Sequence, residues 1–191
     1  SYLLRRYMFP KAGLILSGVL GGLYSSVVTT VILAKQSKEG KHSPRMYAGS
    51  IIIASAMMYF RVYILLLIFN QSLAISSWHL LLFLVSAAVG YLFYKKGEKA
   101  KSLDTLDAAK DNPLEFKVAL VFAILYLVFS ALTQFMITQF GSAGLTTLSF
   151  IVGFTDITPF LLNLFQGHYE ITSTMILIAT MQVMTSNNIL K

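Results

Sequence analysis

The sequence predicts an all-α protein, a polytopic bundle of transmembrane helices with an internal repeat. The composition leads to this fold class, because 56% of the 191 residues are apolar and only 12% are charged, about half the usual charged share. The mean hydropathy is +0.70. The apolar residues form long runs of about twenty, the length that crosses a membrane as a helix. None of these runs shows the alternating polarity of a membrane β-barrel.

Six spans are expected, each a helix because lipid cannot satisfy an open backbone. They cover residues 12–34, 46–69, 78–94, 114–138, 143–165 and 171–190. The fourth has a well-formed start, with Asn112 as a capping residue, Pro113 in the first turn and Glu115 favourable to the helix dipole.

Lysine and arginine set the expected orientation. The first loop holds Lys35, Lys38, Lys41 and Arg45, and the third holds Lys95, Lys96, Lys99 and Lys101. Loops 70–77 and 139–142 hold none, so the first and third loops are expected in the cytoplasm. The same scheme puts loop 166–170 there too. It leaves one conflict, because Arg5, Arg6 and Lys11 then fall on the outer side.

The same figures exclude several classes of protein. So apolar a chain is neither an ordinary soluble domain nor a disordered one. The absence of cysteine excludes a disulfide scaffold and a thiolate metal site. The net charge of +7 lies in short clusters between apolar runs, which argues against nucleic-acid binding. We expect no enzyme and no cofactor, because no nucleophile and base are paired and the histidines lack metal-ligand spacing.

An internal repeat relates the two ends of the chain. Residues 9–14 align with 140–145, sharing Phe-x-x-Ala-Gly-Leu, and the match brings Ser25 opposite Asp156. With a shorter loop, 51–55 aligns with 176–180. Matching spans lie four apart, which predicts parallel copies and about eight helices in the intact domain. We therefore expect a first repeat over 1–94, a cytoplasmic linker over 95–113 and a second repeat over 114–191, each repeat lacking one helix.

Small and hydroxyl residues mark the first span. Gly21 and Gly22 permit close backbone approach or an opened helix. Two hydroxyl rows with i, i+4 spacing follow, formed by Ser25, Ser26, Thr29 and Thr30. They predict oxygen ligands. The alternative is small-residue packing, with the hydroxyls bonded back to their own helix.

An acid stands near the middle of the fifth span. Asp156 is an acidic residue near the middle of an expected span, and a charge at that depth costs at least ~2.5–3.5 kcal/mol, so it predicts a functional site. Gly153 and Pro159 predict a broken helix with free carbonyls. Asp156, Thr155 and Thr158 would then suit a cation or a proton. The alternative is a kinked helix with a neutralised acid.

Three further polar residues extend the pattern. Arg61 aligns with Ser186 and is expected to pair with Asp156, to bind an anion or to reach the membrane interface. Asn187 and Asn188 are costly at depth unless they are hydrogen-bonded. They are expected as ligands or as links between helices.

Four stretches of this sequence resemble a known family. They are 16–26 with Thr29 and Thr30, 112–117, 153–156 and 186–191. They resemble the membrane domain of unknown function that follows an MgtC/SapB-like domain in bacterial inner-membrane proteins. The resemblance implies a multi-pass protein of the bacterial cytoplasmic membrane, with transport suspected and a link to magnesium. The family pattern often has a hydroxyl where Val27 stands and a second acid where Thr158 stands, so these departures favour a proton, a monovalent ion or a degenerate site over a divalent-cation site.

Together these features predict a transporter of an ion or small solute, with an oxygen-lined site at the midplane formed by both repeats. Asp156 would bind the cation. The alternative is a non-transporting membrane module that binds and regulates a partner protein. The expected partners are the lipid bilayer, a cation or proton and a second copy of the chain, whereas the metal and substrate are left open.

Overall fold

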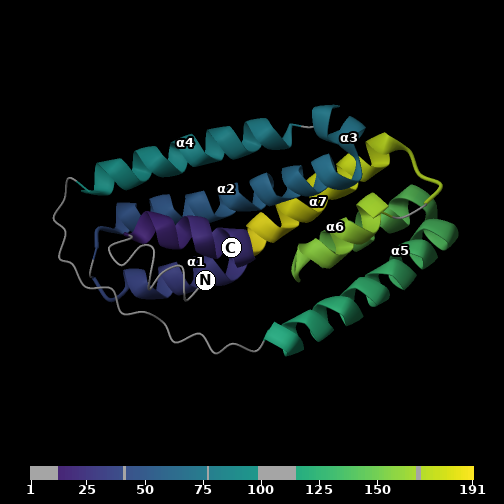
Figure 1. The fold of residues 1–191 in the computed structure, drawn as a ribbon, viewed down its shortest axis with the longest axis horizontal. Helices are drawn as coiled ribbons and strands as arrows, with labels where there is room; N and C mark the ends of the chain where they lie inside the picture. The colour runs from purple at the N-terminus through teal and green to yellow at the C-terminus, as the bar shows by residue number, and fades with distance from the viewer. Residues whose placement is uncertain (1–12, 41, 77, 99–114, 167–168) are drawn as a thin grey trace. The chain divides into compact units, whose positions relative to one another are not determined.

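A computed structural model describes residues 13–40, 42–76, 78–98, 115–166 and 169–191. All regular structure within these ranges is helical (Figure 1), as the sequence predicts. The expected helix start at Asn112 and Pro113 and most of the linker lie outside the described residues. The helices are, in chain order, α1 (Leu14–Ser37), α2 (Pro44–Phe69), α3 (Gln71–Ser76), α4 (His79–Glu98), α5 (Glu115–Val152), α6 (Ile157–Gln166) and α7 (Ser173–Leu190).

The chain divides into two compact units. The first contains Ser1–Arg61 and Trp78–Asn112, and the second contains Val62–Ser77 and Pro113–Lys191. Helix α2 therefore begins in one unit and ends in the other.

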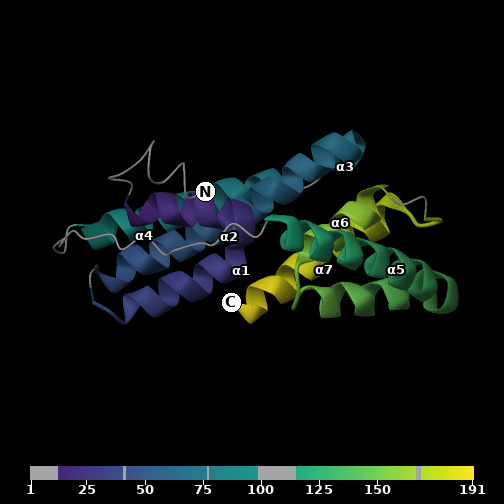
Figure 2. The ribbon, with the colours of Figure 1, turned by 60° about the horizontal axis from the view of Figure 1, so that its bottom comes forward.

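Helix α1 is a hairpin of two short helices. Ser25 has extended backbone angles, with φ −155° and ψ 109°, and interrupts the helix there. A Cβ atom on Gly21 would lie 2.5 Å from Thr29 Oγ1, although eight residues of straight helix span about 12 Å. The two arms, residues 14–24 and 26–37, run in opposite directions (Figures 1 and 2). The structure thus differs from the single crossing expected over 12–34.

Small residues hold the first unit together around α2. A Cβ atom on Gly22 would lie 2.6 Å from Ala54 Cα, so the first arm of α1 contacts the α2 backbone directly. On α4, a Cβ atom on Gly90 would lie 2.8 Å from the Ile53 side chain. Such close approaches are typical of helices packed in membranes.

Helix α5 is also a hairpin, and α6 extends it. Gly141 has φ 57° and ψ −137°, a conformation that favours glycine, and it reverses the chain between residues 115–140 and 142–152. A second break follows at residues 153–156, after which α6 turns back beside the second arm of α5 (Figures 1 and 2). The expected fifth span over 143–165 is therefore a second helical hairpin.

Four helices are long and apolar enough to cross a membrane. They are Leu14–Ser37, Pro44–Phe69, His79–Gly97 and Ala123–Val152. The first and last of these contain the reversals at Ser25 and Gly141. Unbroken candidates for a crossing therefore remain in α2, α4 and the first arm of α5.

Candidate functional site

The first break lies at Ser25, at the tip of the α1 hairpin. The Ser25 hydroxyl accepts a hydrogen bond from the Val28 backbone N–H at 3.4 Å. Ser25 thereby caps the second arm, because its side-chain oxygen accepts a backbone N–H of the first turn that has no helical carbonyl partner. The break also leaves the Tyr24 carbonyl without its usual helical donor, which is the same Val28 N–H.

The other predicted residues of α1 lie around this break. The Thr29 hydroxyl donates to the Ser25 carbonyl, and the Thr30 hydroxyl donates to the Ser26 carbonyl, both at 2.8 Å. These hydroxyls are bonded back to their own helix, as the alternative interpretation had it, and they retain lone pairs for a ligand. Gly21 and Gly22 lie in the helical first arm and allow close contacts, whereas the break itself falls at Ser25.

Arg61 of α2 binds the carbonyls that the first break exposes. Its Nη1 atom donates to the Tyr24 carbonyl at 3.0 Å and lies 3.5 Å from the Leu23 carbonyl. The guanidinium thus meets the C-terminal end of the first arm, where the helix dipole favours positive charge. Pairing of Arg61 with Asp156, which belongs to the other unit, stays a prediction.

The second break has the same local chemistry. Asp156 Oδ1 accepts a hydrogen bond from the Thr158 N–H at 3.0 Å, so Asp156 caps α6. Pro159 is the third residue of α6, in the first turn, where its missing N–H leaves no helical bond unmade. The Thr155 hydroxyl donates to the Val152 carbonyl at 2.9 Å. The Thr158 hydroxyl oxygen is buried with no hydrogen-bond partner among the described residues.

Helix α7 closes this second break from the side. The buried Asn187 side chain donates through Nδ2 to the Gly153 carbonyl at 2.9 Å. A Cβ atom on Gly153 would overlap the Ser186 hydroxyl and lie 2.7 Å from the Val183 carbonyl, so only glycine fits there. Asn188 instead accepts a hydrogen bond from Lys191 Nζ at 2.9 Å, at the end of the helix.

The two breaks share a pattern. In each, a polar residue caps the returning helix, namely Ser25 or Asp156, which the repeat aligns with one another. In each, a donor from a later helix binds a carbonyl just before the break. That donor is Arg61 in the first unit and Asn187 in the second, and the repeat aligns Arg61 with Ser186, one position away. Ser25 and Asp156 lie in different units, and their meeting in one site stays a prediction.

A family model described as a domain of unknown function, DUF4010, matches residues 1–191. The chain belongs to the DUF4010 family. An uncharacterized protein of Aquifex aeolicus (strain VF5) is 29% identical over 146 residues, which are 75% of this DUF4010 chain and 63% of that relative. The chain thus spans less than two thirds of the length of this relative. No solved structure matches this DUF4010 chain significantly.

Sequence reasoning missed a polar cluster in the second unit of this DUF4010 chain. The Tyr169 hydroxyl donates to the buried Asn163 side chain, and Tyr126 donates to Gln166 at 3.1 Å. Burial raises the pKa of the Tyr169 hydroxyl above its ordinary value, although hydrogen bonds from its neighbours, Ser130 first, oppose the shift. The spacing of Tyr126, Ser130 and Thr133, at i, i+4 and i+7 in an apolar helix, could have revealed this cluster.

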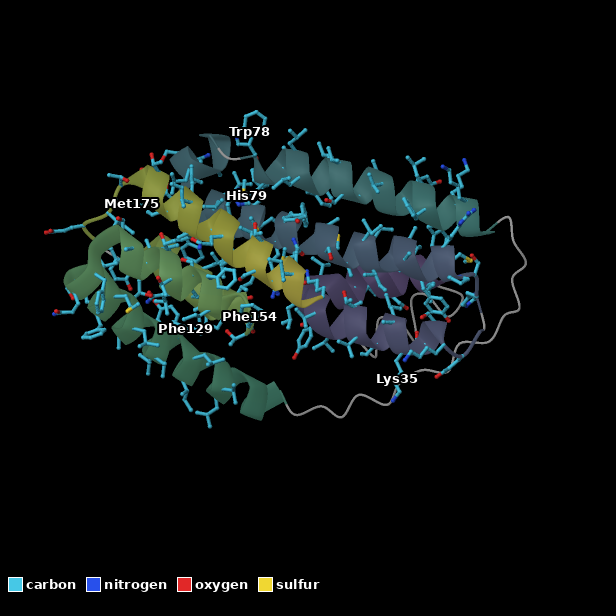
Figure 3. The ribbon with its side chains drawn as sticks, turned by 180° about the vertical axis from the view of Figure 1, so that it is seen from behind. Lys35, Trp78, His79, Phe129, Phe154 and Met175 are labelled. Atoms are coloured by element: carbon cyan, nitrogen blue, oxygen red, sulfur yellow. The ribbon has the colours of Figure 1, made fainter. Side chains whose placement is uncertain are left out.

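One buried histidine was also overlooked. His79 begins α4 and is fully buried, and neither ring nitrogen has a hydrogen-bond partner in the described part of the chain. Its neighbour Trp78 is 66% exposed and points away from the helices (Figure 3). No group of three His, Cys, Asp or Glu side chains within the described ranges could hold a metal ion.

Proposed function

We propose that this membrane protein transports a cation or a small solute through an oxygen-lined site at the membrane midplane. The observation that carries the proposal is the pair of capped breaks, each at the tip of a helical hairpin. Broken helices whose ends meet near the midplane are how many transporters bind their substrates.

The length of the arms favours tips at the midplane. Each arm has about ten to twelve residues, and at 1.5 Å per residue it reaches about 17 Å. The hydrocarbon core is ~30 Å thick, so a hairpin of this length enters about halfway and returns. Ser25 and Asp156 would then both lie near the middle of the bilayer. The polar ends of broken helices are tolerated at that depth only where they line a cavity or are buried in protein.

The hairpins also change the expected topology. Lys35 lies near the end of α1, and Lys95 and Lys96 lie in the last turn of α4, so both ends belong in the cytoplasm. Between the α1 hairpin and the second hairpin the chain crosses with α2, α4 and the first arm of α5. Three such crossings would bring the chain to the outer side before the second hairpin. This count supports inverted copies in place of the expected parallel ones, and it puts loop 166–170 outside.

Oxygen atoms at the two tips would make the site. Asp156 would bind or exchange the cation, with hydroxyl ligands from the hairpins and amide ligands from α7. These ligands are Ser25, Ser26, Thr29, Thr30, Thr155, Thr158, Asn187 and Asn188. A single carboxyl group suits a proton or a monovalent cation better than a divalent one, because divalent sites usually gather several charged ligands.

The setting of the protein belongs to the same proposal. The match with a bacterial relative and the basic loops support a bacterial inner membrane. The resemblance supports a functional link to an MgtC/SapB-like domain, and the short loops suit a homodimer. We propose no enzymatic activity, because the polar groups described at the breaks cap helices and bind carbonyls.

Flux in proteoliposomes tests the proposal. Full-length protein should move H⁺, Na⁺ or K⁺ along a gradient, and Asp156→Asn should abolish that flux while the protein still folds. Glu170→Gln, which removes an acid outside the expected spans, is the matched control and should leave the flux unchanged. Equal flux in Asp156→Asn would remove the carboxyl group from the mechanism. Absence of flux for H⁺, Na⁺, K⁺ and Mg²⁺ would favour the partner-binding module.

A further inference from the structure

The two breaks differ in charge although their geometry is alike. At the first, the carbonyl of Tyr24 receives the guanidinium of Arg61 at 3.0 Å. At the second, the carbonyl of Gly153 receives the neutral amide of Asn187 at 2.9 Å. An acidic residue then caps the returning helix at the second break, where the first break has a serine. The first break therefore carries a fixed positive group and the second a fixed acidic group.

Carbonyl oxygens at the C-terminal end of a broken helix are the groups that coordinate transported Na⁺ or H⁺ in many carriers. In the first hairpin these oxygens, those of Leu23 and Tyr24, face Nη1 of Arg61 at 3.5 and 3.0 Å. A guanidinium stays protonated throughout the physiological range. Its charge therefore repels a second cation from the same oxygens.

We propose that Arg61 acts as a tethered cation, which fills the cation position of the first hairpin so that a mobile cation binds only at the second. This inference rests on the proposed function. It explains why the two hairpins would differ in cation binding. The difference comes from the side chain that binds the carbonyl before each break, which is Arg61 in the first hairpin and Asn187 in the second. The protein would accordingly hold one mobile cation per chain, beside Asp156.

Two sets of variants test the role of Arg61, one that removes the tethered cation from the first break and one that adds a tethered cation at the second. In an Asp156→Asn background the second position is lost, and Arg61→Met then removes the tethered cation while keeping an apolar stem of similar length. We expect this double variant to regain cation binding that Asp156→Asn alone lacks. In the opposite direction, Asn187→Arg should place a tethered cation at the second break and abolish binding, whereas Asn187→Gln, which keeps a neutral donor, should retain it.

The readout is the melting temperature of the full chain in detergent, with chloride salts of Na⁺, K⁺ or Mg²⁺ and choline chloride at matched ionic strength. A cation at about ten times its dissociation constant should raise the melting temperature by about 3–6 °C in a chain of this size. We expect this rise in wild type, its absence in Asp156→Asn and in Asn187→Arg, and its return in the double variant.

The outcomes separate the two proposals. A double variant without the rise, together with an unchanged rise in folded Asn187→Arg, overturns the role of Arg61 and leaves the proposed function standing. A wild type that responds to none of the three salts leaves the proton as the cation of the proposed function. In that case the single variant Arg61→Met decides the role of Arg61. If a salt raises the melting temperature of this variant, the tethered cation is supported, and if no salt does, it is refuted.

Discussion

Asn187 and Gly153 are joined by a buried hydrogen bond of 2.9 Å from the side-chain amide to the backbone carbonyl. The bond links α7 to the second break, 34 residues earlier in the chain. It satisfies an acceptor that the interrupted helix leaves unpaired, because a helical carbonyl needs a donor four residues later. A buried polar side chain of α7 thereby stabilises the irregular backbone opposite it.

Removing this amide should destabilise the second unit. Asn187→Ala leaves the Gly153 carbonyl buried without a donor, which costs about 1–3 kcal/mol. Chemical unfolding in detergent measures the loss. Asn188→Ala is the control, because Asn188 bonds to Lys191 at the helix end, and it should change stability by about 0.5 kcal/mol or less. Equal losses in the two variants would refute a special role for Asn187.

Gly22 should tolerate no side chain. A Cβ atom there would lie 2.6 Å from Ala54 Cα and 2.7 Å from the Ala54 carbonyl oxygen, so backbone must move. We expect Gly22→Ala to cost about 1–3 kcal/mol through overpacking, measured by the same unfolding assay. Val31→Leu adds a carbon at a position that is 62% exposed and should be nearly neutral. A neutral Gly22→Ala would show that α1 and α2 can separate without cost.

Alkaline pH should weaken the polar cluster around Tyr169. Burial raises the pKa of this hydroxyl in the folded protein, so the unfolded chain loses its proton first as pH rises past the ordinary value of 10.0. Stability is therefore fully present below pH 10 and falls above it, until the folded hydroxyl also ionises. Tyr169→Phe should lack this part of the alkaline loss.

Two measurements check the behaviour of Tyr169. Unfolding free energies at intervals from pH 8 to pH 12 should fall less steeply in Tyr169→Phe than in wild type. At pH 7 the variant should be less stable by about 1 kcal/mol, because Asn163 loses its donor. Parallel curves above pH 10 would mean that Tyr169 titrates alike in the folded and unfolded states.

Sequence reasoning could locate the helices and the second break but not the direction of the chain. Apolar runs predict helices because lipid leaves few alternatives, and Gly153 with Pro159 marks an interruption. Whether an interrupted run crosses or returns depends on tertiary packing. Val28 and Val31 in the returning arm of α1 are as apolar as residues of a crossing helix. Apolar composition alone therefore predicts a single span where the structure has a hairpin.

The hydrogen-bond partners of the polar residues could be predicted only in part from the sequence. The i, i+4 spacing of Ser25 and Thr29 indicates that they can interact, and the structure joins them through the Ser25 carbonyl. Arg61 could be recognised as unusual, but its partners are backbone carbonyls. Every residue has a carbonyl, so no residue type in the sequence points to such a partner.

Single cysteines can test whether α1 returns to the side from which it enters, because these 191 residues contain none. Gly13→Cys and Ser37→Cys flank α1 and should both react with an impermeant maleimide from the cytoplasmic side, since the arms reverse at Ser25. Gln139→Cys and Glu170→Cys should both react from the outer side. A single crossing by α1 would instead put Gly13 and Ser37 on opposite sides of the membrane, so that only one of the two cysteines reacts from the cytoplasmic side. That result would contradict the re-entrant hairpin and restore the parallel repeat. Arg5, Arg6 and Lys11, which lie outside the described residues, precede α1 in the chain. A shared cytoplasmic side for both ends of α1 would bring them into agreement with the positive-inside rule.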